Sequence, residues 1–204
     1  MEYPTFYDKV EKIILKDELS EFLGATKDGI IEITYLDCVK LAGHSCPTVA
    51  SSYILANEAI KYLCKKDIPL RSSLKIEFKE SKESGVNGVI ANILTLILGS
   101  FDSGGFSGIG TRFKKRDLLF FNNKNQKGSI KFTNIYTNEF IECNIDTSVV
   151  PANKQMQELM QKALLKVASD EEIEQFKKMW QSRVENMLLN KELWSKIVKI
   201  VNKG

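Results

Sequence analysis

Residues 73–79 read Ser-Leu-Lys-Ile-Glu-Phe-Lys, and this stretch decides the fold class. Leu74, Ile76 and Phe78 alternate with charged residues, which is the two-residue period of a strand with one buried face. Shortly afterwards Asn87–Leu98 is almost entirely apolar and predicts a buried helix, although its isoleucine and valine content keeps a strand as the alternative. A half-buried strand followed by a buried helix favours an α+β fold.

Downstream of residue 98 the chain alternates between a glycine-rich stretch and strand-like stretches. Five glycines within residues 99–110 predict a loop. Residues 118–121, 129–135 and 139–145 predict strands, because β-branched and aromatic residues are concentrated in them. We expect the last two strands to form a hairpin around residues 136–138, within a mixed or antiparallel sheet that packs against helices.

Upstream of residue 73 three further elements are expected. Residues 47–64 predict an amphipathic helix, because Val49, Tyr53 and other apolar residues fall on one side. Residues 30–36 predict a strand. Residues 5–23 predict a helix, because apolar residues recur near one side of it.

After Pro151 the pattern predicts helices only. Residues 153–167 form one expected helix, and Ser169 to Glu172 form a capping box that starts the next. A short last helix is expected around Trp194, and we interpret Trp180 and Trp194 as core or interface residues. Residues 1–150 are therefore expected to be an α+β core domain. Residues 151–204 are expected to be an all-helical extension that packs on its own core, swaps onto a partner subunit, or covers the site as a lid.

The composition is that of a globular protein. The chain has 204 residues, of which 43% are hydrophobic, and this is enough for one substantial core. A net charge of +3 is too small and too evenly spread to indicate nucleic-acid binding, and we interpret the basic cluster 112–116 as a solvated turn before a strand. No signal-peptide pattern and no membrane-spanning apolar run is present, so we expect a cytoplasmic protein with its four cysteines as thiols.

The segment Gly43-His44-Ser45-Cys46-Pro47 carries the residues with the most distinctive chemistry. Pro47 suits the first turn of a helix, so Cys46 is expected at the helix start, where free amides and the helix dipole favour a thiolate. Thiolate and neutral imidazole are common zinc ligands, and a thiolate can also act as a nucleophile. His44 and Cys46 are therefore the predicted metal ligands and catalytic residues. The alternative is a structural pair, with Cys46 as a small apolar residue and His44 bonded to the backbone.

Two ligands do not complete a zinc site, and the chain offers few others. The candidates are Cys38, Cys64, Cys143, Asp37, Asp102 and Asp117. Cys64 is excluded, because it lies about 27 Å further along the predicted helix. The glycine-rich loop has two interpretations, since its amides could hold an anion or the loop could be a mobile or tightly packed turn. Its spacing matches neither a P-loop nor a dinucleotide fingerprint, and Asp102 is more typical of a turn residue.

The segment 43–47 resembles the Gly-His-x-Cys-Pro-Gly signature of the FmdE family of formylmethanofuran dehydrogenase proteins. The order of elements over roughly residues 20–145 is similar too. The resemblance implies an α+β core, a homodimer, and a divalent metal ion, most simply zinc, near His44 and Cys46. It also points to the glycine-rich loop, where Ser100, Asp102, Gly104 and Gly105 are the candidate cofactor-binding residues.

This sequence departs from the family pattern at several positions. Thr48 stands where the family has a glycine, and Ser100 stands where it has a loop cysteine. The loop has no lysine, and the cysteine-rich tail of some members is replaced by residues 151–204. If the family's loop cysteine is needed for chemistry, this chain has lost it or uses a neighbouring group.

The resemblance implies an accessory or maturation factor for a molybdenum- or tungsten-dependent formate or formylmethanofuran dehydrogenase system. Its partners would be a formate dehydrogenase or the proteins that assemble its cofactor. Two alternatives stay open. One is a stand-alone metal- or cysteine-dependent hydrolase or transferase. The other is a non-catalytic interaction module that docks through residues 151–204.

Overall fold

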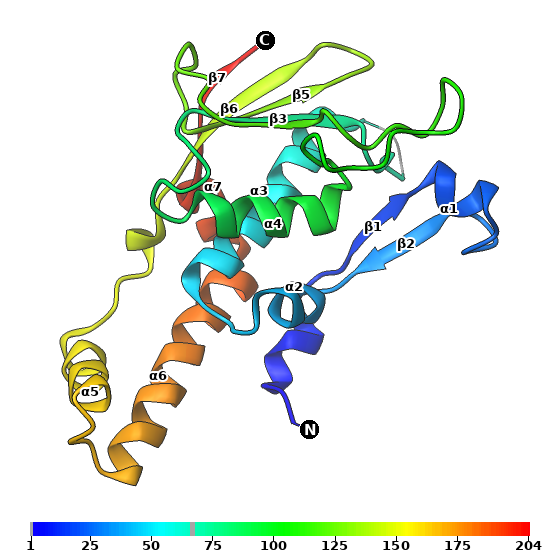
Figure 1. Cartoon of the computed structure of the whole chain (residues 1–204). Coiled ribbons are helices and arrows are strands. Elements are labelled where there is room, and N and C mark those ends of the chain that lie inside the picture. Colours follow the sequence, from blue (N-terminus) through cyan, green and yellow to red (C-terminus); the bar gives the residue numbers. More distant parts are fainter. Residues whose placement is uncertain (1, 66–67) are drawn as a thin grey trace.

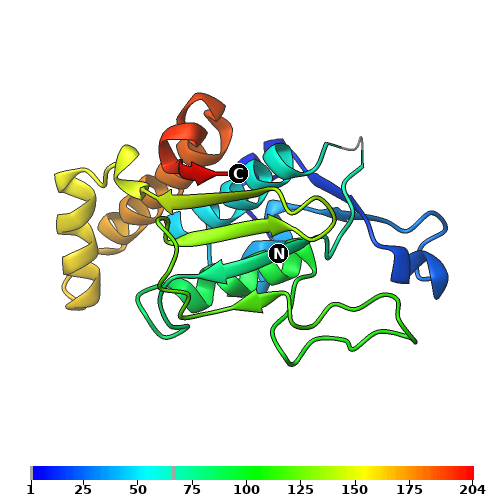
Figure 2. The same cartoon turned by 90° about the horizontal axis from the view of Figure 1, so that it is seen from above.

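A layer of helices covers one face of a β-sheet in the computed structural model, which describes residues 2–65 and 68–204 (Figure 1). Helices α3 (Pro47–Leu63) and α4 (Asn87–Leu98) lie under the sheet, and Figure 2 shows the strands above them. The pair α5 (Lys154–Leu164) and α6 (Asp170–Leu189) extends away from the sheet in Figure 1. The fold is α+β, as predicted.

Five of the described strands form a mixed sheet in the order β4-β3-β5-β6-β7, and β1 (Ile13–Lys16) and β2 (Ile30–Ile33) form a separate two-stranded sheet. The strands of the mixed sheet are β3 (Leu74–Phe78), β4 (Leu119–Phe120), β5 (Ile130–Asn134), β6 (Phe140–Ile145) and β7 (Val198–Lys203). Strand β4 is parallel to β3, and the other neighbours are antiparallel. The predicted hairpin of β5 and β6 is confirmed, with Ile130 opposite Cys143. Leu74, Ile76 and Phe78 are all buried, so the alternation in β3 corresponds to the two faces of the sheet.

Helix α3 is the most buried element of the fold. Eleven of its 17 residues are buried, and it contacts α2, α4, α6 and β6. Cys46 caps its first turn and Pro47 occupies the first helical position, where a missing N–H costs nothing. The predicted helices 47–64 and 87–98 are both confirmed.

The prediction of one helix over residues 5–23 is wrong. This segment contains a 3-10 helix η1 (Thr5–Lys9), the strand β1 (Ile13–Lys16) and a short helix α1 (Glu18–Phe22). Ile13 and Leu15 are buried whereas Ile14 is 48% exposed, so the local period is two residues. Strand β1 pairs with β2 (Ile30–Ile33), a long-range partner that helical spacing alone does not reveal.

The predicted strand 30–36 is too long, because a helix begins inside it. Thr34 caps α2 (Tyr35–Ala42) in a capping box with Asp37. Gly43 ends that helix with a left-handed backbone at φ 75°, a conformation that glycine adopts without strain.

Residues 151–204 are not all helical, which corrects the prediction for their end. The capping box at Ser169 is confirmed, and α5 and α6 form as expected. However, α7 (Trp194–Ile197) is short, and β7 follows it as the edge strand beside β6. Two short 3-10 helices, η2 (Thr147–Val149) and η3 (Lys191–Leu193), complete the element order.

The C-terminal segment also contributes side chains to the hydrophobic core. Val184, Met187, Leu188 and Trp194 belong to the same buried cluster as α3 and the sheet. Trp194 donates its indole N–H to the carbonyl of Met187 at 3.1 Å, which agrees with its interpretation as a core residue. In this chain the segment therefore packs on its own core.

Within the described ranges, no helix is long and apolar enough to cross a membrane. The four cysteines are free, as expected.

We predict that Leu188→Ala destabilises the whole protein. Leu188 is 1% exposed in the shared core, so the substitution should lower the free energy of unfolding by about 3 kcal/mol. Leu165→Ala is the matched control, because Leu165 is 73% exposed and the same change there should have little effect. Urea denaturation followed by circular dichroism measures both. A separate transition for residues 151–204, with the rest unaffected by Leu188→Ala, would show that the segment is an independent unit.

Candidate functional site

The loop of residues 43–46 connects the end of α2 to the start of α3. Its backbone is held by Ser45, which is buried between the two ends. The Ser45 hydroxyl shares a hydrogen bond of 2.9 Å with the Tyr35 hydroxyl, and its carbonyl accepts the indole N–H of Trp180 at 2.9 Å. The loop is therefore fixed from the core side and from α6.

His44 and Cys46 flank Ser45 and are more accessible. His44 is exposed, and its Nδ1 lies 2.9 Å from the carbonyl oxygen of Ala42. Because a carbonyl oxygen can only accept, Nδ1 carries the proton in this contact and Nε2 carries the lone pair. Cys46 is half-buried, and its Sγ accepts the backbone N–H of Val49 at 3.5 Å. The structure thus places both predicted donors at the start of α3.

Two protein ligands alone do not close a metal site. In the described part of the chain, no group of three or more His, Cys, Asp and Glu side chains is placed to hold a metal ion. Burial, aided by the nearby Asp37 carboxylate, raises the pKa of the Cys38 thiol to about 12, and burial likewise raises the pKa of Cys143 to about 12. Cys64 caps the opposite end of α3. The other cysteines therefore do not complete the site as thiolates.

An aromatic groove adjoins the loop on the α6 side. It has a volume of about 340 Å³ and is lined by Ser45 together with Tyr7, Phe176 and Trp180. Helix α6 forms one wall of it, so residues from the C-terminal segment do border the predicted site. A ligand bound at His44 and Cys46 would have an apolar surface beside it.

The glycine-rich loop lies elsewhere in the molecule. Ser100 is fully buried and donates its hydroxyl to the carbonyl of Leu74 at 2.6 Å. Leu74 follows Ser73, whose hydroxyl is 3.9 Å from Sγ of Cys64 at the end of α3. About 25 Å separates the two ends of this helix, so the structure does not bring Ser100 together with Cys46.

The loop residues are engaged within the loop itself. Asp102 accepts the backbone N–H of Gly104 at 2.9 Å, so it is a turn residue. A Cβ added at Gly105 would lie 2.4 Å from Cβ of Phe101, so this glycine allows close packing of the loop. These contacts match the packed-turn interpretation of the predicted cofactor-binding residues Ser100, Asp102, Gly104 and Gly105.

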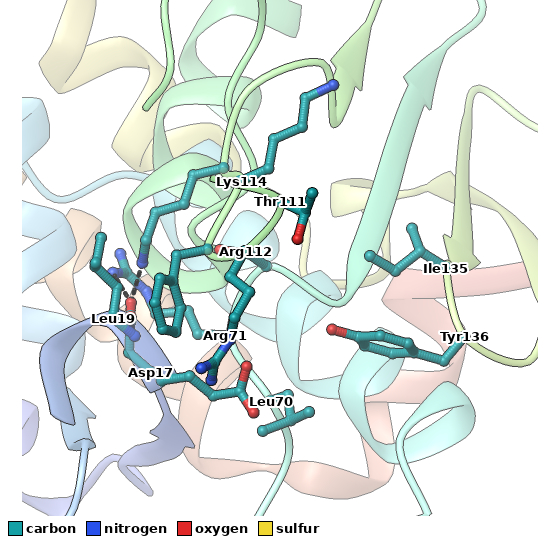
Figure 3. Close-up of a pocket in the computed structure, with 13 residues that line it drawn as sticks. Asp17, Leu19, Leu70, Arg71, Thr111, Arg112, Lys114, Ile135 and Tyr136 are labelled. Carbon is teal, nitrogen blue, oxygen red and sulfur yellow. Dashed lines mark hydrogen bonds and ion pairs between the residues drawn. The ribbon is translucent and has the colours of Figure 1, made fainter. Parts of the chain in front are cut away.

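Sequence reasoning missed a buried charge network. Asp17 is 3% exposed; its carboxylate accepts a hydrogen bond from Arg71 Nη1 at 3.1 Å and forms an ion pair with Lys115 (Figure 3). Arg71 also donates to the carbonyls of Leu96 and Ile97 at the end of α4, at 2.7 and 3.1 Å. The network joins the N-terminal hairpin of β1 and β2 to residues 70–72 and to residues 111–116. We call residues 111–116, which follow the glycine-rich loop, the arm.

The charges of this network follow from its geometry. Burial raises the pKa of Asp17, but the contacts with Lys115, the Ser20 amide and Arg71 outweigh burial and hold it below its ordinary value of 3.8. For Lys115 burial prevails, and its pKa lies below the ordinary lysine value. The Lys115 side chain is half-buried, with 12% of it exposed, which corrects the interpretation of residues 112–116 as a solvated turn. Arg112, Lys114 and Arg116 remain exposed.

No protein-family model matches the chain, and no curated protein matches it either. The resemblance to the FmdE family therefore stays a prediction.

We predict that Asp17→Asn lowers the free energy of unfolding by about 3 kcal/mol at pH 7, because it leaves two half-buried cations without their carboxylate. The pKa of Asp17 is lower in the folded state than in the unfolded chain, so the stabilisation is present above about pH 5 and is lost as the pH falls through the folded pKa. Urea denaturation at several pH values should show the difference from wild type shrinking toward low pH. Asp117→Asn, which removes an exposed partner of Lys114, is the control and should change little. A difference that is independent of pH would contradict the assignment.

Proposed function

We propose that the protein binds a divalent metal ion, most simply zinc, through Nε2 of His44 and Sγ of Cys46. The observation that supports this most is the 2.9 Å contact between Nδ1 of His44 and the Ala42 carbonyl. Metal-binding histidines are typically oriented by such a bond, because it fixes the ring and leaves the other nitrogen as the ligand. An exposed ring held in this way is suited to bind rather than to fill a core.

The backbone around the loop supports the two donors. Gly43 turns the chain out of α2, and the bond from Trp180 to the Ser45 carbonyl holds the residue between them. Cys46 lies at the start of a 17-residue helix, and its sulfur accepts the backbone N–H of Val49 at 3.5 Å. A bound zinc ion with open positions would supply Lewis acidity toward a further ligand.

We propose that a second copy of the chain supplies the missing ligands. Two copies would contribute two cysteines and two histidines, which is a common tetrahedral zinc set. A homodimer of this kind agrees with what the resemblance of residues 43–47 implies. The same resemblance supports the role of an accessory or maturation factor for a molybdenum- or tungsten-dependent formate or formylmethanofuran dehydrogenase.

We predict that the protein purified without chelator contains zinc, and that the double variant His44→Ala/Cys46→Ala does not, because both proposed ligands are gone. Cys64→Ala is the matched control, since Cys64 is also half-buried but lies at the other end of α3. Elemental analysis gives the metal content, and circular dichroism checks that each variant is folded.

The stoichiometry tests the shared site. A site formed by two copies requires one zinc per two chains and a dimer that dissociates on chelation, as seen by size-exclusion chromatography with light scattering. One zinc per monomer would contradict the shared site and leave the ion with water or substrate as further ligands. Equal metal content in the wild type and the double variant would rule out the proposed ligands.

A further inference from the structure

A cleft lies at the opposite end of α3 from the His44 loop. It consists of two adjoining hollows with volumes of about 310 and 570 Å³, and Glu18, Leu70, Arg112 and Tyr136 line both. We call this feature the Arg112 cleft and define it by these four residues. Volumes of this size suit a small organic molecule.

Arg112 differs from the other cations around the cleft. Arg71 and Lys115 are paired with Asp17, and Lys114 forms an ion pair with Asp117 at 2.8 Å. In Figure 3 the Lys114 side chain points away from the cavity. The Arg112 guanidinium lies 4.5 Å from the centre of the Phe113 ring, and among residues 2–65 and 68–204 it forms no ion pair. It is thus an oriented cation whose N–H groups are not engaged by a carboxylate.

The arm that carries Arg112 is held in place. The Phe113 ring packs against Phe22 of α1 with ring centres 5.0 Å apart. The backbone of Arg112 exchanges hydrogen bonds with that of Ile109 at 2.9 and 3.1 Å. Lys115 anchors the arm further along, through Asp17. The guanidinium is therefore positioned before any ligand arrives, which lowers the entropy cost of binding.

The facing wall is apolar and aromatic. Tyr136, in the turn between β5 and β6, is 65% exposed, and Figure 3 shows its hydroxyl end directed toward the arm that carries Arg112. The Tyr136 amide donates to the Asn134 side chain at 2.9 Å, which fixes the turn. Leu70 and Pro69 continue the apolar surface into the larger hollow. Such a wall suits a planar apolar group.

The charge around the cleft limits the ligand further. Glu18 also lines both hollows, and it would repel additional negative charge next to Arg112. Lys65 at the rim is already paired with Glu139 at 2.5 Å. A ligand with one anionic group fits this arrangement.

We propose that the Arg112 cleft binds a small organic anion that carries a single carboxylate or phosphate group on an aromatic or apolar body. The Arg112 guanidinium would bind the anion through paired N–H groups, and Tyr136 with Leu70 would contact the body. The site lies at the other end of α3 from His44 and Cys46, and it requires no metal.

Four probe compounds test this proposal by titration into ¹⁵N-labelled full-length protein, with amide chemical shifts as the readout. Benzoate and phenyl phosphate carry a carboxylate and a phosphate group, respectively, on the same phenyl ring. Benzyl alcohol has the ring without an anionic group, and inorganic phosphate is the anionic group without a ring. At least one of the two aromatic anions should shift the amides of residues 111–115 and 135–137 in a saturable manner, and the better one identifies the head group. Benzyl alcohol and inorganic phosphate should bind at least tenfold more weakly.

Arg112→Ala should weaken binding of the better anion at least tenfold, and thermal unfolding will verify that the variant is folded. Arg116→Ala is the matched control, because Arg116 is exposed in the same arm and lies 3.7 Å from Asp117. Its affinity should stay within twofold of the wild type. Absence of saturable shifts with both anions, an equal loss in the two arginine variants, or equal binding of benzyl alcohol would each overturn the proposal.

Discussion

The burial of α3 is the constraint on which the rest of this structure depends. A helix with 11 of 17 residues buried between the sheet, α4 and α6 has no freedom to rotate or slide. Its first residue therefore fixes where Cys46 lies, and its last turn fixes where Cys64 meets Ser73. The His44 loop and the Arg112 cleft lie at the two ends of this one helix, so the packing of the core sets the position of both.

The parts of the fold that could be predicted are those whose local pattern matches their burial. Strand β3 and helix α3 each show one clear period, and each forms as expected. Residues 87–98 are almost entirely apolar, and they form the helix α4 rather than the alternative strand. Residues 13–16 and 198–203 are short apolar stretches that fit either period, and a distant partner strand decides between them. Helix α2 is different, because the Thr34–Asp37 capping box is readable in the sequence.

The same distinction separates the His44 and Cys46 pair from the Asp17 network. His44 and Cys46 stand in one loop, so a single segment reveals them. The contacts of Asp17 reach across 54 residues to Arg71 and across 98 to Lys115, and no local pattern encodes them. The basic cluster 112–116 also looks uniform in sequence. A left-handed backbone at Phe113, with φ 64°, interrupts this segment. Phe113 packs on Phe22, the half-buried Lys115 pairs with Asp17, and Arg112 stays exposed.

The buried network also shapes the field in the Arg112 cleft. The last carbonyls of α4 lack partners in the helix, and Arg71 binds those of Leu96 and Ile97. Asp17 then balances one of the two cations, so the group of Asp17, Arg71 and Lys115 retains one net positive charge. Because Arg71 and Lys115 are largely shielded from solvent and line the smaller hollow of the cleft, water screens this charge less than it would on an open surface. Asp17, Arg71 and Lys115 line the smaller hollow of the cleft, so their net positive charge favours an anion beside Arg112.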